Sequence, residues 1–347
     1  MNSQRAEDWR SRGGYFSWRP TGKDAASVEV FHLEIGDPDA PVLLFLHGWP
    51  TSSFDWFDVA SRLSAKFRVC ALDFPGYGFS GKPHGWGYSL SRDEELVDFY
   101  VSEVIGAWAG VVVAHDRGDS VALAYAARCA EGRSAMRLGH LILSNGNVFL
   151  PLSTLTDAQR LILDAATWPA IAAALTPARL AEGLGATTFT PPLRAGDPEV
   201  DALALILGYE DGTTVLHETI QYLVERSENE QSWLSALAGV PFPVTLIWGL
   251  HDAVSPPRVA TYVWHEYLML KPGGNRLYFI PDANHYLQVD RPDAFVTVLL
   301  HALESTEDQR PGALGAEPGA PILVDTSRAR LPTAADLLRV EPPGHVT

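Results

Sequence analysis

The sequence predicts a doubly wound, mostly parallel α/β sheet with helices on both faces and a helical lid inserted into it. Several short runs rich in Val, Ile and Leu are continuous rather than alternating, which is typical of strands buried on both faces of a sheet. Helical patterns separate most of these runs, and this alternation favours parallel strands joined by crossover helices. The alternation stops between residues 147 and 238, which contain Ala/Leu-rich helical patterns and no clear strand.

Each predicted strand is a short apolar run followed by a turn-forming or polar residue. The runs are 28–35, 42–46, 68–73, 111–116, 140–146, 244–249 and 276–282, and the helical patterns are 52–65, 89–108, 118–131, 256–270 and 291–303. We therefore assign residues 1–146 and 239–304 to the core of the fold. Residues 147–238 form the lid, because they are too many for a plain loop. Residues 305–347 are rich in Pro and Gly, and we expect a poorly ordered extension.

The chain of 347 residues is acidic, with 42 Asp and Glu against 26 Lys and Arg and a formal charge of −16. This balance argues against a nucleic-acid partner, because phosphate binding needs clustered basic side chains. Two cysteines, Cys70 and Cys129, match neither a disulfide framework nor a zinc ligand set. The sequence has no apolar leader and no run of 18 apolar residues, so we expect a cytoplasmic protein without a membrane span.

The segment Val111–Ser120 (VVVAHDRGDS) predicts a sharp turn between a strand and a helix. Ala114 and Gly118 flank the turn two positions on either side of Asp116, where larger side chains would clash. The central residue of such an elbow adopts a strained backbone and is usually the Ser nucleophile; here it is Asp116. A helix-capping aspartate is the alternative interpretation, and on this segment alone the two carry similar weight.

Three other strand ends carry residues that complete a catalytic set. His47-Gly48-Trp49-Pro50 follows the run 42–46 and supplies a backbone N–H for an oxyanion. Asp252 follows the run 244–249, and His285 follows the last run, 33 residues later. The order nucleophile, acid, base is the Ser…Asp…His order of one large class of hydrolases, with Asp in the Ser position. Asn145 follows another strand, but an amide carries no charge, so Asp252 is the better acid.

These motifs resemble the α/β-hydrolase superfamily and, within it, the aspartate-nucleophile branch of epoxide hydrolases and haloalkane dehalogenases. HGWPTSSFDW, FRVCALDFPGYGFSGKP, HDRGDSVA and LSNGN resemble more specifically the group of the mesoderm-specific transcript protein and its bacterial relatives, as do QYLVER and Trp233. The resemblance covers residues 14–303. It is specific at the strand ends and weaker through the lid.

An aspartate nucleophile suits displacement at a saturated carbon, because its carboxylate is already ionised at neutral pH. Attack would leave an alkyl ester on Asp116. His285, oriented by Asp252, would then activate water to hydrolyse that ester. The backbone N–H groups of Trp49 and Arg117 are the candidate oxyanion donors for this second step, worth about 3–4 kcal/mol each.

The leaving group depends on which residues assist its departure. The dehalogenases place a Trp after the nucleophile to bind halide, whereas this chain has Arg117 there and Trp49 in its HGWP motif. HDRG also resembles fluoroacetate dehalogenases, but their second Arg, three residues after the first, is Ser120 here. Asp119 is expected to point outward from the first turn of its helix, where the helix dipole favours a carboxylate.

Epoxide hydrolases protonate the opening oxygen with two lid tyrosines. Tyr222 resembles the later of these, and Tyr209 is a substitute for the earlier one only if the lid folds it inward. Trp168 and Trp233 are further candidates for lining the pocket. Packing of the lid on the core explains all four side chains as well.

Our leading prediction is an epoxide hydrolase that takes a small apolar organic substrate and water. A haloalkane or haloacid dehalogenase is the second hypothesis, and a weakly catalytic protein that binds a small apolar ligand is the third. The complete set of Asp116, Asp252 and His285 opposes the third. No metal-ligand cluster and no phosphate-binding glycine loop occurs in the sequence, so we expect no cofactor.

Overall fold

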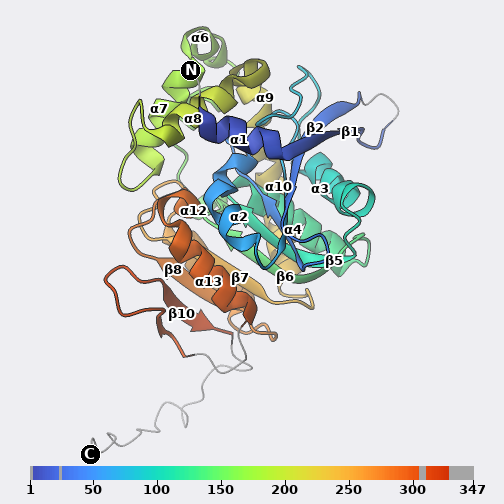
Figure 1. Cartoon of the computed structure of the whole chain (residues 1–347), viewed down its shortest axis with the longest axis vertical. Coiled ribbons are helices and arrows are strands. Elements are labelled where there is room, and N and C mark those ends of the chain that lie inside the picture. The colour runs from blue at the N-terminus through green and yellow to red at the C-terminus, as the bar shows by residue number, and fades with distance from the viewer. Residues whose placement is uncertain (1–2, 23–25, 305–309, 328–347) are drawn as a thin grey trace, which may run out of the picture.

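The computed structural model describes residues 3–22, 26–304 and 310–327 (Figure 1). Within them, ten strands form a single sheet in the order β1-β2-β4-β3-β5-β6-β7-β8-β10-β9. The strands are β1 Gly13–Trp18, β2 Val28–Ile35, β3 Val42–Leu46, β4 Arg68–Leu72, β5 Ala109–His115, β6 Arg137–Ser144, β7 Val244–Gly249, β8 Arg276–Ile280, β9 Gly312–Ala313 and β10 Ile322–Thr326. Strands β4, β3, β5, β6, β7 and β8 pair in parallel, whereas β1, β2, β10 and β9 extend the two edges by antiparallel pairing. The predicted fold class is confirmed.

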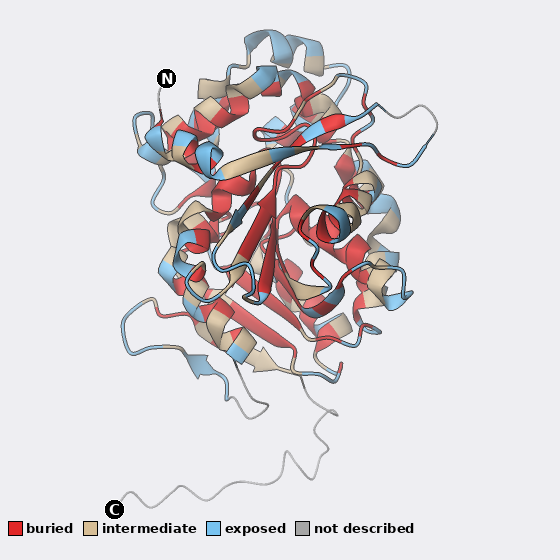
Figure 2. Cartoon of the chain, turned by 45° about the vertical axis from the view of Figure 1, so that its right-hand side comes forward, coloured by how far each residue is buried: buried red, intermediate tan, exposed pale blue. Residues whose placement is uncertain are grey.

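Helices cover both faces of this sheet. They are α1 Gln4–Arg12, α2 Phe57–Leu63, α3 Leu90–Phe99, α4 Arg117–Ala130, α11 Pro257–Val263, α12 Leu287–Asp290 and α13 Pro292–Glu304, with the short helical turns η1 Ser53–Trp56, η2 Tyr100–Val104 and η5 Trp264–Leu268. Helices α2 and α13 pack on one face, and α3 and α4 on the other. Leu44 and Leu46 join one apolar core and their neighbours Leu43 and Phe45 the other, which explains the continuous apolar run. Figure 2 shows the central strands largely buried, and β3 and β7 are buried at every residue.

The chain between β6 and β7 is helical and contains no strand. Its elements are η3 Leu150–Leu152, α5 Asp157–Leu163, α6 Trp168–Ala174, α7 Pro177–Thr188, α8 Pro198–Gly208, η4 Tyr209–Val215, α9 Leu216–Thr219 and α10 Tyr222–Leu237. We call residues 147–238 the cap. Helices α6, α7 and α8 lie above one end of the sheet (Figure 1), and α10 packs on α4 of the core.

Both ends of the chain contribute structure that the sequence did not predict. Helix α1 buries Trp9, whose Nε1 donates to Ser53 Oγ at 3.1 Å, and β1 pairs with β2. The expectation of poor order over 305–347 is wrong for Ile322–Thr326, because this apolar run pairs with the otherwise open edge of β8. Residues 305–309 and 328–347 lie outside the described residues.

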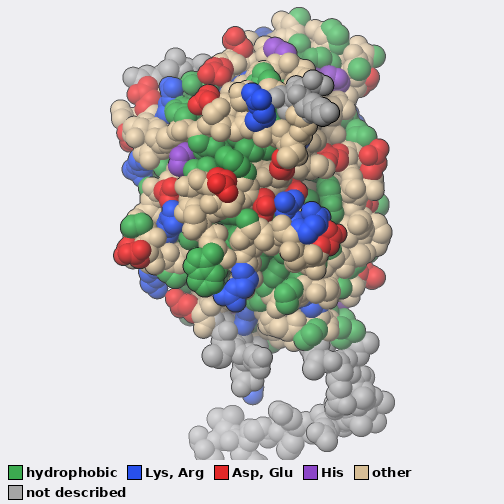
Figure 3. All heavy atoms as spheres, turned by 90° about the vertical axis from the view of Figure 1, so that its right-hand side faces the viewer, with side chains coloured by type: hydrophobic (Ala, Val, Ile, Leu, Met, Phe, Trp, Pro, Cys, Tyr) green, Lys and Arg blue, Asp and Glu red, His purple; other side chains and the backbone are tan. Residues whose placement is uncertain are grey.

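On the face shown in Figure 3, acidic and basic side chains are interspersed. Among the described residues, no helix has the length and apolar character needed to cross a membrane.

Candidate active site

Asp116 occupies a sharp turn between β5 and α4, with φ 52° and ψ −115°. Small neighbours make this turn possible. A Cβ on Gly118 would lie 2.6 Å from the Leu46 carbonyl oxygen, and one on Gly48 would lie 2.7 Å from the Asp116 Cβ. The close approach of the β3 loop therefore requires glycine at both positions, and the strained conformation turns the Asp116 side chain toward that loop.

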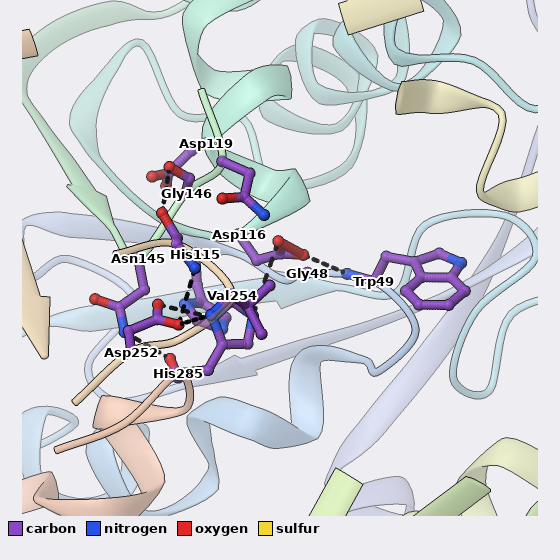
Figure 4. A network of polar contacts seen from close by, with 12 residues as sticks. Gly48, Trp49, His115, Asp116, Asp119, Asn145, Gly146, Asp252, Val254 and His285 are labelled. Atoms are coloured by element: carbon purple, nitrogen blue, oxygen red, sulfur yellow. Dashed lines mark hydrogen bonds and ion pairs between the residues drawn. The ribbon is translucent and has the colours of Figure 1, made fainter. Parts of the chain in front are cut away.

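Asp116, Asp252 and His285 come from three strand ends and meet at one edge of the sheet (Figure 4). His285 Nδ1 lies 3.0 Å from Asp252 Oδ2, and His285 Nε2 lies 3.8 Å from Asp116 Oδ1. Asp252 is itself held by the backbone N–H groups of Val254 and Ser255, which donate to its Oδ1 at 2.8 and 2.9 Å. All three predicted residues are buried, and the structure brings them together in the predicted order.

The two predicted oxyanion donors lie on either side of Asp116. The Trp49 backbone N–H donates to Asp116 Oδ2 at 3.1 Å. Arg117 is the first residue of α4 and follows Asp116 directly. Asp116 Oδ1 is buried and has no hydrogen-bond partner within the described part of the chain, so one carboxylate oxygen is anchored by a hydrogen bond and the other is not.

His285 carries a proton more readily than an isolated histidine. Burial lowers its pKa, but the charge and hydrogen bond of Asp252, together with Asp116 and Asp55, outweigh burial and raise the pKa to about 9. The imidazole is therefore held protonated at neutral pH.

The Arg117 side chain lies beneath the site and is fully enclosed. Its guanidinium forms an ion pair with Asp93 and lies 5.2, 5.0 and 5.4 Å from the ring centroids of Phe74, Tyr77 and Tyr222. Burial raises the pKa of Asp93 to about 6, although the charge of Arg117 opposes the shift. Arg117 thus supplies a fixed positive charge between three aromatic rings.

Tyr222, at the start of α10, lies beside Asp116. Its phenol is buried, and burial followed by the charge of Asp116 raises its pKa. Its hydroxyl forms no hydrogen bond with other described residues, and its ring lies 4.8 Å from the guanidinium of Arg226 as well as 5.4 Å from that of Arg117. Tyr222 therefore lies next to Arg117 and within the electrostatic influence of Asp116, although it is not among the residues that line the cavity described below.

Arg226 is a site residue that sequence reasoning missed, although it belongs to the QYLVER motif. It is buried on α10, and its Nε donates to Ser120 Oγ at 2.6 Å while Nη1 donates to the Asn147 carbonyl at 2.8 Å. Position 120 is where the second arginine of the fluoroacetate dehalogenase pattern is absent. Because position 120 is Ser rather than Arg, Arg226 of the cap occupies the space beside α4 that an arginine at position 120 would fill.

Three other predicted lid residues lie elsewhere. Tyr209 lies near α1. Its ring centroid is 5.3 Å from that of Phe79, and its hydroxyl accepts a hydrogen bond from Arg10 Nη2 at 3.1 Å. Trp168 stacks on His217 at 5.8 Å. Trp233 packs against the apolar core. None of the three lines the cavity described below, so the expectation for them is wrong, because packing between helices decided which way each ring turned.

Asp119 differs from expectation, whereas Asn145, which was not expected to be the triad acid, has a structural position behind the site. Asp119 is buried rather than outward, because the end of β6 covers the first turn of α4; its Oδ1 accepts from the Ser144 N–H at 3.2 Å, and burial raises its pKa well above the usual value. Asn145 ties strand ends together. Its Nδ2 donates to the carbonyls of Asn284 and His285 at 2.8 and 2.9 Å, and its Oδ1 accepts from the Gly249 N–H at 2.9 Å.

A cavity of about 480 Å³ opens above the site. Trp49, His285 and Tyr286 form its inner end, and apolar residues of α5, α6 and α7 form most of its walls. Its size is in the usual range for small-molecule sites, and an apolar lining with few polar groups fits an apolar organic ligand.

Comparisons with known proteins agree with this fold. Residues 41–292 match the family described as alpha/beta hydrolase fold. The chain is 34% identical over 303 residues to the putative hydrolase LipZ of Mycobacterium tuberculosis, covering 87% of this chain and 99% of that protein. It is 28% identical to the mesoderm-specific transcript homolog protein of Bos taurus, covering 86% and 87% of the two chains. The crystal structure of the haloalkane dehalogenase DbeA from Bradyrhizobium elkani superposes with a TM-score of 0.67 at 20% identity, covering 85% of this chain and all (100%) of that one.

This protein belongs to the α/β-hydrolase fold family, and it is a hydrolase of that fold. The resemblance inferred from the strand-end motifs is thereby confirmed.

Proposed function

We propose that the protein hydrolyses epoxides to vicinal diols through an alkyl ester on Asp116. The observation that carries the proposal is the Asp116 carboxylate at the elbow, with Oδ2 bound by the Trp49 N–H at 3.1 Å and a bare Oδ1 near His285. In the first step Oδ1 attacks an epoxide carbon, the carbon–oxygen bond breaks, and the released oxygen takes the proton of the Tyr222 hydroxyl. Arg117 and Arg226, on the Tyr222 ring, stabilise the resulting phenolate.

Ester formation prepares His285 for the second step. The ester carries no charge, so Asp116 no longer helps to hold a proton on His285; the imidazole releases that proton to solvent and becomes a neutral base. His285 then takes a proton from water as the water oxygen bonds to the Asp116 carbonyl carbon. The N–H groups of Trp49 and Arg117 stabilise the oxyanion. Collapse releases the diol, which takes the His285 proton, and the Asp116 acid proton returns to the Tyr222 phenolate. With the Asp116 carboxylate restored, His285 takes up a proton from solvent again.

Two contacts favour an epoxide over a halide as the reacting group. The Tyr222 ring lies 5.4 Å from the guanidinium of Arg117, the residue next to Asp116, and its hydroxyl has no hydrogen-bond partner among the described residues, which suits a proton donor to an opening epoxide. The Trp49 indole N–H, the group best placed by sequence to hold a halide, instead donates to Thr219 Oγ1 at 3.2 Å. A haloalkane or haloacid dehalogenase stays the alternative.

The test is a His285→Gln variant incubated with mixed epoxides and haloalkanes and weighed intact by mass spectrometry. Without the base, the ester on Asp116 should persist. A gain equal to a whole epoxide is the expected result, and it should disappear in the His285→Gln, Asp116→Asn double variant. A gain of an alkyl group without its halogen would instead indicate a dehalogenase. No adduct from a broad panel, with folded protein, would overturn the ester mechanism in favour of a ligand-binding protein.

A further inference from the structure

The cavity reaches the protein surface between two cap helices. Its inner end is buried and carries Trp49 and His285. The lining residues that are exposed all lie on α5 and α7, and they are Ala158, Leu161, Arg179, Gly183 and Thr187. The opening is therefore bounded by α5 on one side and α7 on the other.

One face of α7 lines the cavity along the length of the helix. Leu180 and Leu184 lie on that face, and the helix ends at Thr188, whose carbonyl accepts from the N–H of Tyr286, next to His285. The ten residues from Arg179 to Thr188 span about 14 Å of helix. The cavity thus has an apolar wall that is long in one direction, which suits an extended chain more than a compact ring system.

Gly183 lies at the opening, and neither backbone nor packing requires glycine there. It lies inside α7 without a positive φ, and a Cβ added to it would meet nothing within 4 Å. Gly185, two residues later, contrasts with it, because a Cβ there would lie 2.9 Å from Val200 Cγ2. Glycine weakens a helix interior relative to alanine. The empty space beside Gly183 is the mouth of the cavity.

Leu161 faces the same opening from α5 and is 42% exposed, so the rim is apolar at the surface. Arg179, also at the rim, is held to the side by its hydrogen bond from Nη1 to the Ala174 carbonyl at 3.0 Å. Together, an apolar rim, a glycine gap and a long apolar wall describe a channel that is open at its outer end.

We propose that Gly183 sets the width of this channel and that the substrate is an unbranched aliphatic compound, with its reactive end at Asp116 and its tail leaving between α5 and α7. The substrate class rests on the proposed function, whereas the channel itself is tested without any reaction.

The experiment is calorimetric binding of straight-chain primary alcohols from six to twelve carbons, which contain no epoxide or halogen. For the wild-type protein we expect the dissociation constant to fall about fourfold with each added methylene up to the longest chains. Gly183→Trp should leave the short alcohols unchanged and weaken the longest at least tenfold. Ala186→Trp is the matched control, because Ala186 is an exposed small residue of α7 that does not line the cavity, and it should behave as wild type.

Three results would overturn the channel. They are equal effects of the two Trp variants, a wild-type affinity that stops rising at the shortest chains, and branched alcohols that bind as tightly as straight ones. Gly183→Leu serves as a second variant if the Trp variant does not fold, as judged by its unfolding transition. Because alcohols report the channel and the His285→Gln adduct reports the reaction, a failure of one is distinguishable from a failure of the other.

Discussion

His285 lies between two carboxylates, and its ionisation links the site to the stability of the fold. A pKa raised to about 9 means that the folded protein holds this proton at pH values where the unfolded chain, with an ordinary histidine, releases it. The stabilisation is therefore fully present below about pH 6.5 and is lost as the pH rises through about 9.

From this sign we predict that the wild-type free energy of unfolding falls between pH 6.5 and 9 by on the order of 3 kcal/mol more than that of His285→Gln. Urea unfolding of both proteins at several pH values measures the difference. Subtracting the profile of the variant from that of the wild type cancels the contributions of the other titrating groups. Parallel profiles for the two proteins would mean that Asp252 and Asp116 do not hold a proton on His285.

Asn145 acts on the site from behind it, through the backbone of the His285 loop. In Asn145→Asp, a carboxylate oxygen replaces the amide group that donates to the carbonyl oxygens of Asn284 and His285. Negatively charged or polarised oxygens would then face one another in the protein interior and repel. We expect a loss of at least about 2 kcal/mol in the free energy of unfolding. Asn229→Asp is the control, since half-buried Asn229 donates only to the Glu225 carbonyl of its own helix, and it should cost much less.

At the scale of single elements, helix α7 gives up stability for an open channel. Gly183→Ala adds a methyl group into empty space and removes the flexibility of glycine, so we expect a gain of about 0.5–1 kcal/mol, measured by urea unfolding. Gly185→Ala, in the same helix, should instead destabilise the protein, because its Cβ would press on Val200. Equal changes at the two positions would contradict the packing difference between them.

Strand β10 protects an edge of the sheet. It pairs antiparallel with β8, from Ile322 opposite Phe279 to Thr326 opposite Arg276, and buries Leu323 against the core. Without it, the backbone groups of β8 on that side would be unpaired, and open edges of this kind promote association between chains.

At the scale of the whole molecule we therefore predict that a chain ending at Glu304 self-associates and unfolds at a lower urea concentration than the full chain. A chain ending at Ser327, which keeps β10, is the control and should stay like the full-length protein. Light scattering and urea unfolding report the two effects. If the chain that ends at Glu304 is monomeric and as stable as the full chain, pairing of β10 with β8 is not needed for stability or for preventing association.

The cap and the core are joined at the site itself. Arg226 extends from α10 to Ser120 on α4 and to the Asn147 carbonyl at the start of the cap, and Tyr222 of the same helix lies beside Asp116. The position of the proposed proton donor relative to the carboxylate therefore depends on how the cap sits on the core.

The sequence by itself determined the parts of this protein that obey local rules. The apolar runs predicted all six parallel strands and β2, and the small residues around Asp116 predicted its elbow. The carboxyl-terminal ends of neighbouring parallel strands lie on the same side of a sheet. Asp116, Asp252 and His285 each follow such a strand, so their meeting was predictable from the sequence. Strands β1, β9 and β10 were not, because short edge strands depend on a partner to form.

Tertiary structure alone decided which cap residues reach the site. Tyr209 and Tyr222 both occur in apolar helical patterns, yet one packs outward near α1 and the other lies beside Asp116. Helical periodicity shows that a helix has a buried face but not which neighbour covers it. The inward turn of Asp119, the reach of Arg226 and the opening beside Gly183 all follow from how the cap helices pack on one another and on the core, and they exist only in the folded chain.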